Sequence, residues 1–190
     1  MRFNLVVVGY GGQGVLSLAE IISRGAIEEG YEVRAVEIHG LSQRGGMLQC
    51  HVRFGERIFS PLVRKAGANL IIALDVLEAL RACYYANKET IVLTDTKLLT
   101  PRPIPERPLK AKDILKEIKK FAKVEAVGAS EIVEKLTGEA TMSNIFMLGY
   151  SIKKKLLPIK KENAWKAVSQ RIRPQFLEAN KKIFEEAFKL

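Results

Sequence analysis

Three glycines near the N-terminus form a pattern that is typical of a phosphate-binding turn. Gly9, Gly11 and Gly14 satisfy G-x-G-x-x-G directly after an apolar run that predicts a buried strand. In such a turn the glycines allow a tight bend, a close approach of the backbone to a ligand and close packing of the following helix. The free amide groups at the start of that helix favour an anion. This turn, which also contains Gly12 and Gln13, is the first candidate binding loop.

An acidic residue follows at the distance where a dinucleotide-binding fold places its ribose ligand. Glu37 stands near the end of the next predicted strand, so an enzyme that binds NAD(P) or a flavin nucleotide through the three glycines and Glu37 is one hypothesis. The same turn can also serve only to join a strand to a helix. In that case the chain is an interaction module without a ligand.

A second glycine-containing loop carries an arginine. Its residues Ser42, Gln43, Arg44, Gly45 and Gly46 stand directly before another predicted strand. A guanidinium group holds a carboxylate or phosphate through two parallel hydrogen bonds, and the paired glycines give the backbone conformational freedom. We therefore expect a second anion receptor on a loop adjacent to the first.

Together, the two loops resemble those of the gamma-type subunits of the 2-oxoacid:ferredoxin oxidoreductases. The sequence around the second loop is most similar to that of the beta subunit of the indolepyruvate ferredoxin oxidoreductases. The resemblance covers the whole chain and is strongest over residues 5–95. It implies a non-redox subunit of an enzyme that oxidatively decarboxylates a 2-oxoacid, here indolepyruvate or another aryl pyruvate, to an acyl-CoA. Electrons pass to ferredoxin through a larger partner subunit, which carries thiamine diphosphate, magnesium and [4Fe-4S] clusters, and coenzyme A is the co-substrate.

The resemblance also points to a pair of polar residues further along the chain. Thr141 and Asn144 stand before an apolar helical stripe, where family members place a Thr/Asn pair. We expect both to face the carboxyl ends of the strands, where ligands bind in open α/β sheets. The alternative is a helix N-cap followed by a hydrogen-bonded core amide.

This chain alone lacks the residues for redox chemistry. Its two cysteines, Cys50 and Cys83, have no C-x-x-C spacing, whereas one [4Fe-4S] cluster takes four thiolates. No recognisable thiamine diphosphate and magnesium motif is present either, so we expect the chain to bind none of these cofactors and to be inactive alone. The cysteines are expected to be buried, reduced thiols of a cytoplasmic protein. The lone His51 is expected on the polar face of its strand, as a surface residue.

Charge and hydropathy exclude two further classes of partner. The net charge of +10 arises entirely in residues 97–190, where lysines alternate with glutamates on helical patterns without interleaved aromatics. This indicates solvated helix faces, as in heat-adapted proteins, rather than a nucleic-acid surface. No apolar run reaches the roughly 18 residues of a membrane span, so we expect neither nucleic acid nor membrane as a partner.

The alternation of strand and helix patterns predicts the α/β class. We expect residues 1–190 to form a single Rossmann-like domain, with a mostly parallel sheet flanked by helices and a β-hairpin extension. The hairpin is expected between an alternating strand over 47–54 and a strand over 57–60. Asp75, Ser130 and Pro174 are expected to begin helices, with Glu78 completing a capping box for the first. The four prolines in 101–108 indicate an extended linker.

Overall fold

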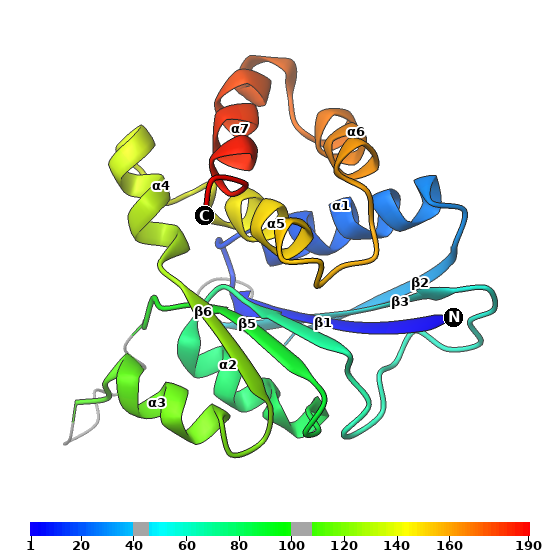
Figure 1. The fold of residues 1–190 in the computed structure, drawn as a ribbon, viewed down its shortest axis with the longest axis vertical. Coiled ribbons are helices and arrows are strands. Elements are labelled where there is room, and N and C mark those ends of the chain that lie inside the picture. The colour runs from blue at the N-terminus through cyan, green and yellow to red at the C-terminus, as the bar shows by residue number, and fades with distance from the viewer. Residues whose placement is uncertain (40–45, 100–107) are drawn as a thin grey trace.

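A six-stranded sheet with helices on both faces organises the chain (Figure 1). The computed structural model describes residues 1–39, 46–99 and 108–190. The predicted linker over 101–108 therefore lies almost entirely outside the described residues. The strands are β1 (Arg2–Tyr10), β2 (Glu32–His39), β3 (Met47–Gly55), β4 (Leu70–Ala73), β5 (Ile91–Asp95) and β6 (Lys123–Val127). The helices are α1 (Val15–Glu28), α2 (Val76–Ala82), α3 (Ala111–Ile118), α4 (Ala129–Thr137), α5 (Ser143–Lys153), α6 (Lys161–Arg171) and α7 (Pro174–Glu186), with a short 3-10 helix, η1 (Cys83–Tyr85).

The sheet is parallel except for one strand. Its order is β2-β3-β1-β4-β5-β6, with β1, β4, β5 and β6 parallel and β3 antiparallel to both of its neighbours. The predicted α/β class with a mostly parallel sheet is confirmed. The hairpin, however, joins β2 to β3, and the prediction of a strand over 57–60 was wrong. Both edges of β3 are already occupied by β1 and β2, so no edge of β3 remains for that segment. Arg34 and Arg53 instead bind its backbone, donating to the carbonyls of Ile58 and Ser60.

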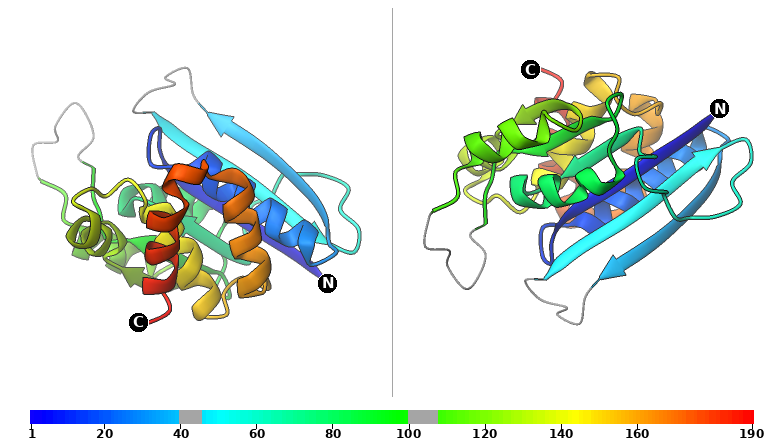
Figure 2. Two further views of the ribbon diagram at one scale, coloured as in Figure 1. Left: turned by 90° about the horizontal axis from the view of Figure 1, so that it is seen from above. Right: turned by 90° about the horizontal axis from the view of Figure 1, so that it is seen from below.

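The two faces of the sheet carry separate apolar clusters. Helices α1, α5, α6 and α7 lie on one side of the sheet and α2 and α3 on the other (Figures 1 and 2). Strand β1 contributes to both, because Leu5 and Val7 pack towards α1 and α5, whereas Val6 and Val8 pack towards α2. This two-sided burial is what a central parallel strand requires.

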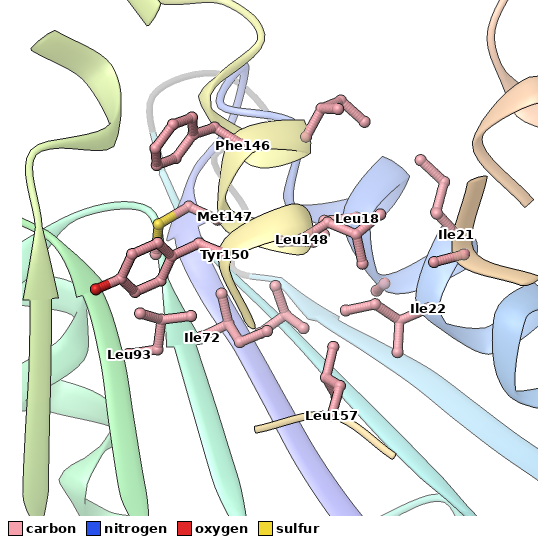
Figure 3. Packing of buried hydrophobic residues seen from close by; sticks show 14 of the residues in the cluster. Leu18, Ile21, Ile22, Ile72, Leu93, Phe146, Met147, Leu148, Tyr150 and Leu157 are labelled. Carbon is pink, nitrogen blue, oxygen red and sulfur yellow. The ribbon is translucent and has the colours of Figure 1, made fainter. Parts of the chain in front are cut away.

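Helix α5 forms the middle of the larger cluster. Its residues 143–151 are all buried. The Leu148 side chain points towards α1, whereas Phe146, Met147 and Tyr150 lie on the other side of the helix, away from α1 (Figure 3). A helix that is buried all round needs apolar residues on every side rather than one stripe. Helix α5 is therefore fixed against α1, and this contact sets the geometry of the candidate site below.

Several helix boundaries follow from local chemistry. Asp75 Oδ1 accepts hydrogen bonds from the amides of Leu77 and Glu78 at 2.8 and 3.1 Å, which confirms Asp75 as the N-cap of α2. Pro174 begins α7 as predicted. The prediction that Ser130 caps α4 was wrong. Gly128 is the N-cap, and Ser130, one residue inside the helix, donates from its amide and hydroxyl to the buried Asp95 at the end of β5.

Candidate functional site

The glycine turn at the end of β1 is held together by Gln13. The Tyr10 amide donates to Gln13 Oε1 at 2.7 Å, and Gln13 Nε2 donates to the carbonyl of Leu74 at 2.9 Å. The side chain therefore ties the end of β1 to the end of the neighbouring strand β4. A Cβ atom on Gly9 would lie 2.7 Å from Gln13 Oε1, so this glycine makes room for the clamp. Both polar groups of the Gln13 amide are used inside the protein.

Gly14 brings the N-termini of two helices together. It is the N-cap of α1, with a φ of 83°, and its carbonyl accepts from Asn144 Nδ2 at 3.3 Å. A Cβ atom at Gly14 would lie 2.5 Å from that nitrogen. Asn144 stands in the first turn of α5, and among the described residues no side chain caps either α1 or α5. The partially positive N-termini of α1 and α5 therefore meet at the carboxyl ends of the parallel strands.

The two glycine-containing loops meet, as expected, at the part of the second loop that the structure describes, Gly46. The Gly11 amide donates to the carbonyl of Gly46 at 3.0 Å, and the register pairs Tyr10 with Met47 across β1 and β3. Gly12 is exposed, with nothing within 4 Å of the position of a Cβ atom. Ser42, Gln43, Arg44 and Gly45 lie outside the described residues. The antiparallel insertion of β3 is thus what brings the second loop to the first.

Glu37 lies beside the glycine turn but in a different arrangement from a dinucleotide site. It is exposed on the edge strand β2, and it lines a pocket of about 270 Å³ with Gly11, Leu16 and Gly46. Strand β3 stands between β1 and β2. The Gly11 amide, which a dinucleotide fingerprint would offer to a pyrophosphate, is bonded to Gly46. The pocket is also smaller than most ligand pockets, which begin at about 300 Å³.

Thr141 and Asn144 share a second pocket close by. It has a volume of about 440 Å³ and is lined also by Arg171, Arg173 and Phe176. Thr141 was predicted to open its helix, but Met142 is the N-cap of α5 and the Thr141 hydroxyl donates to Glu139 Oε2 at 3.4 Å. Asn144 is buried, with Oδ1 accepting from the Ile145 amide at 2.9 Å. The two residues are neighbours, but the Asn144 side chain contributes to the contact between α1 and α5.

The placement of His51 on a solvent-exposed face was wrong. His51 is 1% exposed, its Nδ1 accepts from the Val63 amide at 3.0 Å, and its ring packs edge-on against Tyr85. Burial lowers its pKa to about 4. The alternating pattern of β3 predicted a half-exposed strand, but the segment that returns from β3 covers this face and provides a backbone donor for the ring. Gln49 is buried beside it, against the Tyr85 hydroxyl.

The cysteines are buried and free, as predicted. Cys50 belongs to the cluster beneath α1, whereas Cys83 belongs to the cluster beneath α2, on the opposite face of the sheet. Burial raises the pKa of Cys50 to about 12 and that of Cys83 to about 11. Two thiols on opposite faces cannot ligate one cluster. The described residues contain no group of three or more His, Cys, Asp or Glu side chains suited to a metal ion.

One polar residue near the turn was not recognised as such from the sequence. Glu78 was expected to close a capping box, but its carboxylate pairs with Arg81 and is 1% exposed. Burial raises the pKa of Glu78 and also that of the nearby Tyr10, which interacts with it. Its position, three residues after a helix N-cap, predicted a local role and gave no sign of these tertiary contacts.

Comparison with known proteins assigns this geometry to a family. Residues 4–190 match the family model described as pyruvate ferredoxin/flavodoxin oxidoreductase. The chain belongs to this family. Among curated members, the indolepyruvate oxidoreductase subunit IorB of Archaeoglobus fulgidus is 34% identical over 99% of this chain and 94% of its own length.

Solved structures of the family have the same fold. The gamma subunit of a keto/oxoacid ferredoxin oxidoreductase from Geobacter sulfurreducens superposes with a TM-score of 0.73 at 21% identity, covering 98% of this chain and 96% of that subunit. A 2-oxoglutarate:ferredoxin oxidoreductase from Magnetococcus marinus, solved with 2-oxoglutarate, coenzyme A and succinyl-CoA, gives a TM-score of 0.74 at 17% identity. The match covers 98% of this chain but 30% of that one. At these identities the superpositions establish the shared fold.

In the described residues, no helix is long and apolar enough to cross a membrane.

Proposed function

We propose that the chain is the small, non-redox subunit of a 2-oxoacid:ferredoxin oxidoreductase that acts on indolepyruvate or a related aryl pyruvate. The observation that carries this proposal is the full-length similarity to an indolepyruvate oxidoreductase subunit. In this reaction the 2-oxoacid and coenzyme A give an acyl-CoA, carbon dioxide and two electrons, which reduce ferredoxin. The larger subunit contributes the thiamine diphosphate, magnesium and [4Fe-4S] clusters that this chain cannot hold, and these supply carbanion stabilisation and one-electron transfer.

The contribution of this chain is an anion receptor at the carboxyl edge of the sheet. The uncapped N-termini of α1 and α5 supply partial positive charge, and Gly12 leaves an open approach to the backbone. Arg44 adds a guanidinium on the adjoining loop. Gly9 and Gln13 shape the turn from inside, and Gly14 and Asn144 fix the two helices relative to each other.

Three anions fit such a receptor. They are a phosphate of coenzyme A, the carboxylate of the 2-oxoacid and a carboxylate of the larger subunit. All three carry anionic oxygens that can accept two parallel hydrogen bonds from a guanidinium and that a helix N-terminus attracts. A ligand-free interaction module would need no such receptor, so the effect of removing Arg44 separates it from the proposed function.

Reconstitution tests the proposal. The purified chain should be colourless and inactive with a 2-oxoacid, thiamine diphosphate and coenzyme A, and activity should appear when its larger subunit is added. Unaided turnover, or iron absorbance in the pure chain, contradicts the assignment. In the complex, Arg44→Lys should cost about 1.5–3 kcal/mol of binding free energy, because the second charge-assisted hydrogen bond is lost.

The same variant identifies the anion. A raised KM for coenzyme A or for the 2-oxoacid indicates that ligand, whereas weaker assembly indicates a carboxylate of the larger subunit. Arg24→Lys is the matched control, since Arg24 is a partly exposed residue on α1 paired with Glu20. If Arg44→Lys leaves assembly and kinetics unchanged, Arg44 does not belong to the site. A lower melting temperature of the free subunit would make Arg44 a structural tether instead.

A further inference from the structure

The segment that leads from β3 to β4 carries two large apolar side chains into the solvent. Phe59 is 72% exposed and Leu62 is 53% exposed, although each stands beside a buried residue, Ile58 or Val63. We call residues 56–65 the Phe59 loop. This loop begins beside the N-terminus, at the opposite end of β1 from the glycine turn (Figure 1). It is therefore separate from the anion receptor.

The backbone of the Phe59 loop is fixed to the sheet by two arginines. Arg53 Nη1 donates to the carbonyls of Ser60 and Leu62 at 2.8 and 3.3 Å. Arg34 Nε donates to the carbonyl of Ile58 at 3.0 Å. The exposed side chains are thus presented by a backbone that is already ordered, so a partner that binds them pays little conformational entropy.

The burial of β3 accounts for only part of this loop. Ile58 and Val63 are 2% and 4% exposed, and the Val63 amide donates to the buried His51. These residues cover the strand. Phe59 and Leu62 contribute little to the cover, because both keep more than half of their surface in water. Exposed apolar groups held close together mark an interaction site, and aromatic residues are enriched in protein interfaces.

The unpaired charges of the Phe59 loop are all positive. Its one acid, Glu56, pairs with the N-terminal amino group at 2.7 Å. Within the described residues, Arg57, Arg64 and Lys65 form no ion pair. The Arg57 guanidinium lies 4.8 Å from the centroid of the Phe59 ring. A partner that matches this surface therefore carries carboxylates around an apolar recess.

A second copy of this chain and ferredoxin match the surface less well. A two-fold contact uses the same patch on both copies, so Arg57, Arg64 and Lys65 would oppose their own kind, and like charges repel across an interface. Ferredoxin must approach the iron-sulfur clusters, which the proposed function places in the larger subunit. Electron-transfer contacts are also small and transient, whereas permanent interfaces are more hydrophobic. Two exposed apolar anchors therefore favour a permanent partner.

We propose that the Phe59 loop docks onto the larger subunit, with Phe59 and Leu62 in an apolar recess whose carboxylates pair with the three cations of the loop. The inference rests on the proposed function, since it assigns a docking contact to the same complex. The loop and the anion receptor lie at opposite ends of β1. Contacts at both ends of one strand fix the orientation of this chain in the complex.

Two variants test the apolar part of the contact in the assembled enzyme. Phe59→Ser and Leu62→Ser should each raise the Kd for the larger subunit by about tenfold or more, because a buried anchor is lost. Phe121→Ser is the matched control. Phe121 is 47% exposed and precedes β6, at the opposite edge of the sheet from β2 and β3, so this variant should keep the wild-type Kd. Circular dichroism should show that every free variant is folded.

A charge reversal tests the cationic part. Arg64→Glu should raise the Kd by about tenfold at low salt, and the difference from wild type should shrink as salt screens the ion pairs. Lys119→Glu makes the same change in net charge at an exposed position at the end of α3. This control should stay within about twofold of the wild-type Kd. Equal effects of the two reversals overturn the inference, because net charge rather than the loop would then set the affinity.

The remaining outcomes are distinct. Wild-type Kd in both apolar variants overturns the inference but leaves the proposed function intact, whereas failure of the wild-type chain to assemble with its larger subunit overturns both. If Phe59→Ser assembles normally but raises the KM for ferredoxin, the occupant is ferredoxin. If the free chain dimerises in sedimentation and Phe59→Ser abolishes the dimer without affecting the complex, the occupant is a second copy. Either of these results overturns the inference.

Discussion

At the scale of single residues, the glycines of the turn have different physical roles. Gly12 and Gly14 both have positive φ, at 100° and 83°. Gly12 has open space around the position of a Cβ atom, whereas Gly14 is in close contact with Asn144. The motif requires glycine at position 14 but not at position 12, which is one of its unspecified positions. The structure separates backbone conformation, which both require, from close packing, which only Gly14 requires.

Alanine substitutions should reveal this difference. Gly12→Ala should lower the free energy of unfolding by about 1 kcal/mol, because only the left-handed backbone conformation is penalised. Gly14→Ala should cost about 2–4 kcal/mol, since the new methyl group also collides with Asn144 Nδ2. Urea unfolding of both variants measures the two costs. Equal losses would show that the contact between α1 and α5 adds nothing.

His51 should make stability depend on pH. Its pKa is lowered by burial from 6.5 to about 4, so the unfolded chain binds a proton that the folded chain refuses between these values. The stabilisation is complete above pH 6.5 and is lost as the pH falls towards 4. We expect the wild-type chain to lose about 3 kcal/mol more between pH 7 and pH 4 than His51→Gln does. Urea unfolding of both chains at the two pH values measures this difference.

At the scale of elements, patterns within one segment predicted more than contacts between segments. The apolar run of β1 and the N-cap at Asp75 each depend on neighbours in sequence, and both are confirmed. The position of β3 depends on which strand edges remain free, and the strand over 57–60 was mispredicted for that reason. Polar residues on an alternating strand indicate exposure only when nothing covers them. Val63 and Tyr85, remote in sequence, cover His51.

For the candidate site, too, some contacts were predicted from the sequence and others were not. The meeting of the two loops was expected from their glycine-containing motifs, and the bond between Gly11 and Gly46 joins them in the structure. The roles of Gln13 and Asn144 could not be predicted. Their amides bond to backbone groups of Leu74 and Gly14, 61 and 130 residues away along the chain.

The contact between α5 and α7 should be highly sensitive to added volume. A Cβ atom at Gly149 would lie 2.7 Å from the carbonyl oxygen of Phe184 and 2.9 Å from Ala187 Cβ. Backbone atoms cannot rotate away from the added methyl group as a side chain can. Gly149→Ala should therefore lower the free energy of unfolding by about 1–3 kcal/mol. Gly25→Ala on α1 is the control, because its nearest neighbour would be the Ile159 side chain at 3.2 Å. A larger loss in Gly25→Ala than in Gly149→Ala would contradict this account of the packing.

At the scale of the whole molecule, several lysines of the second half are solvent-exposed and paired with acidic neighbours. Lys116, Lys120 and Lys189 each pair with an acidic residue three positions earlier, and all are well exposed. Such pairs contribute about 0–1 kcal/mol each. The lysines therefore set the long-range field of the molecule more than its stability, and this field attracts acidic partners.

The binding of pyridine nucleotides distinguishes this architecture from a dinucleotide-binding one. Strand β3 lies between β1 and β2, and the Gly11 amide is hydrogen-bonded to Gly46. The pyrophosphate of a dinucleotide would therefore lack the backbone amide that usually donates to it. A calorimetric titration of the free chain with NAD or NADP should give no saturable heat. Glu37→Ala, which changes the residue that would hold the ribose, should be indistinguishable from wild type. Saturable binding that Glu37→Ala abolishes would restore the dinucleotide hypothesis.

The central position of β1 has a consequence for biosynthesis. This strand leaves the ribosome first, yet its two partners β3 and β4 end at Gly55 and Ala73, and α5, which packs over it, ends at Lys153. Translation adds about 5–20 residues per second, so the apolar strand is without its two strand partners for several seconds on the nascent chain. During this interval it is a natural substrate for chaperones. Slow synthesis before β3 has emerged would promote aggregation, whereas the same delay after α5 would not.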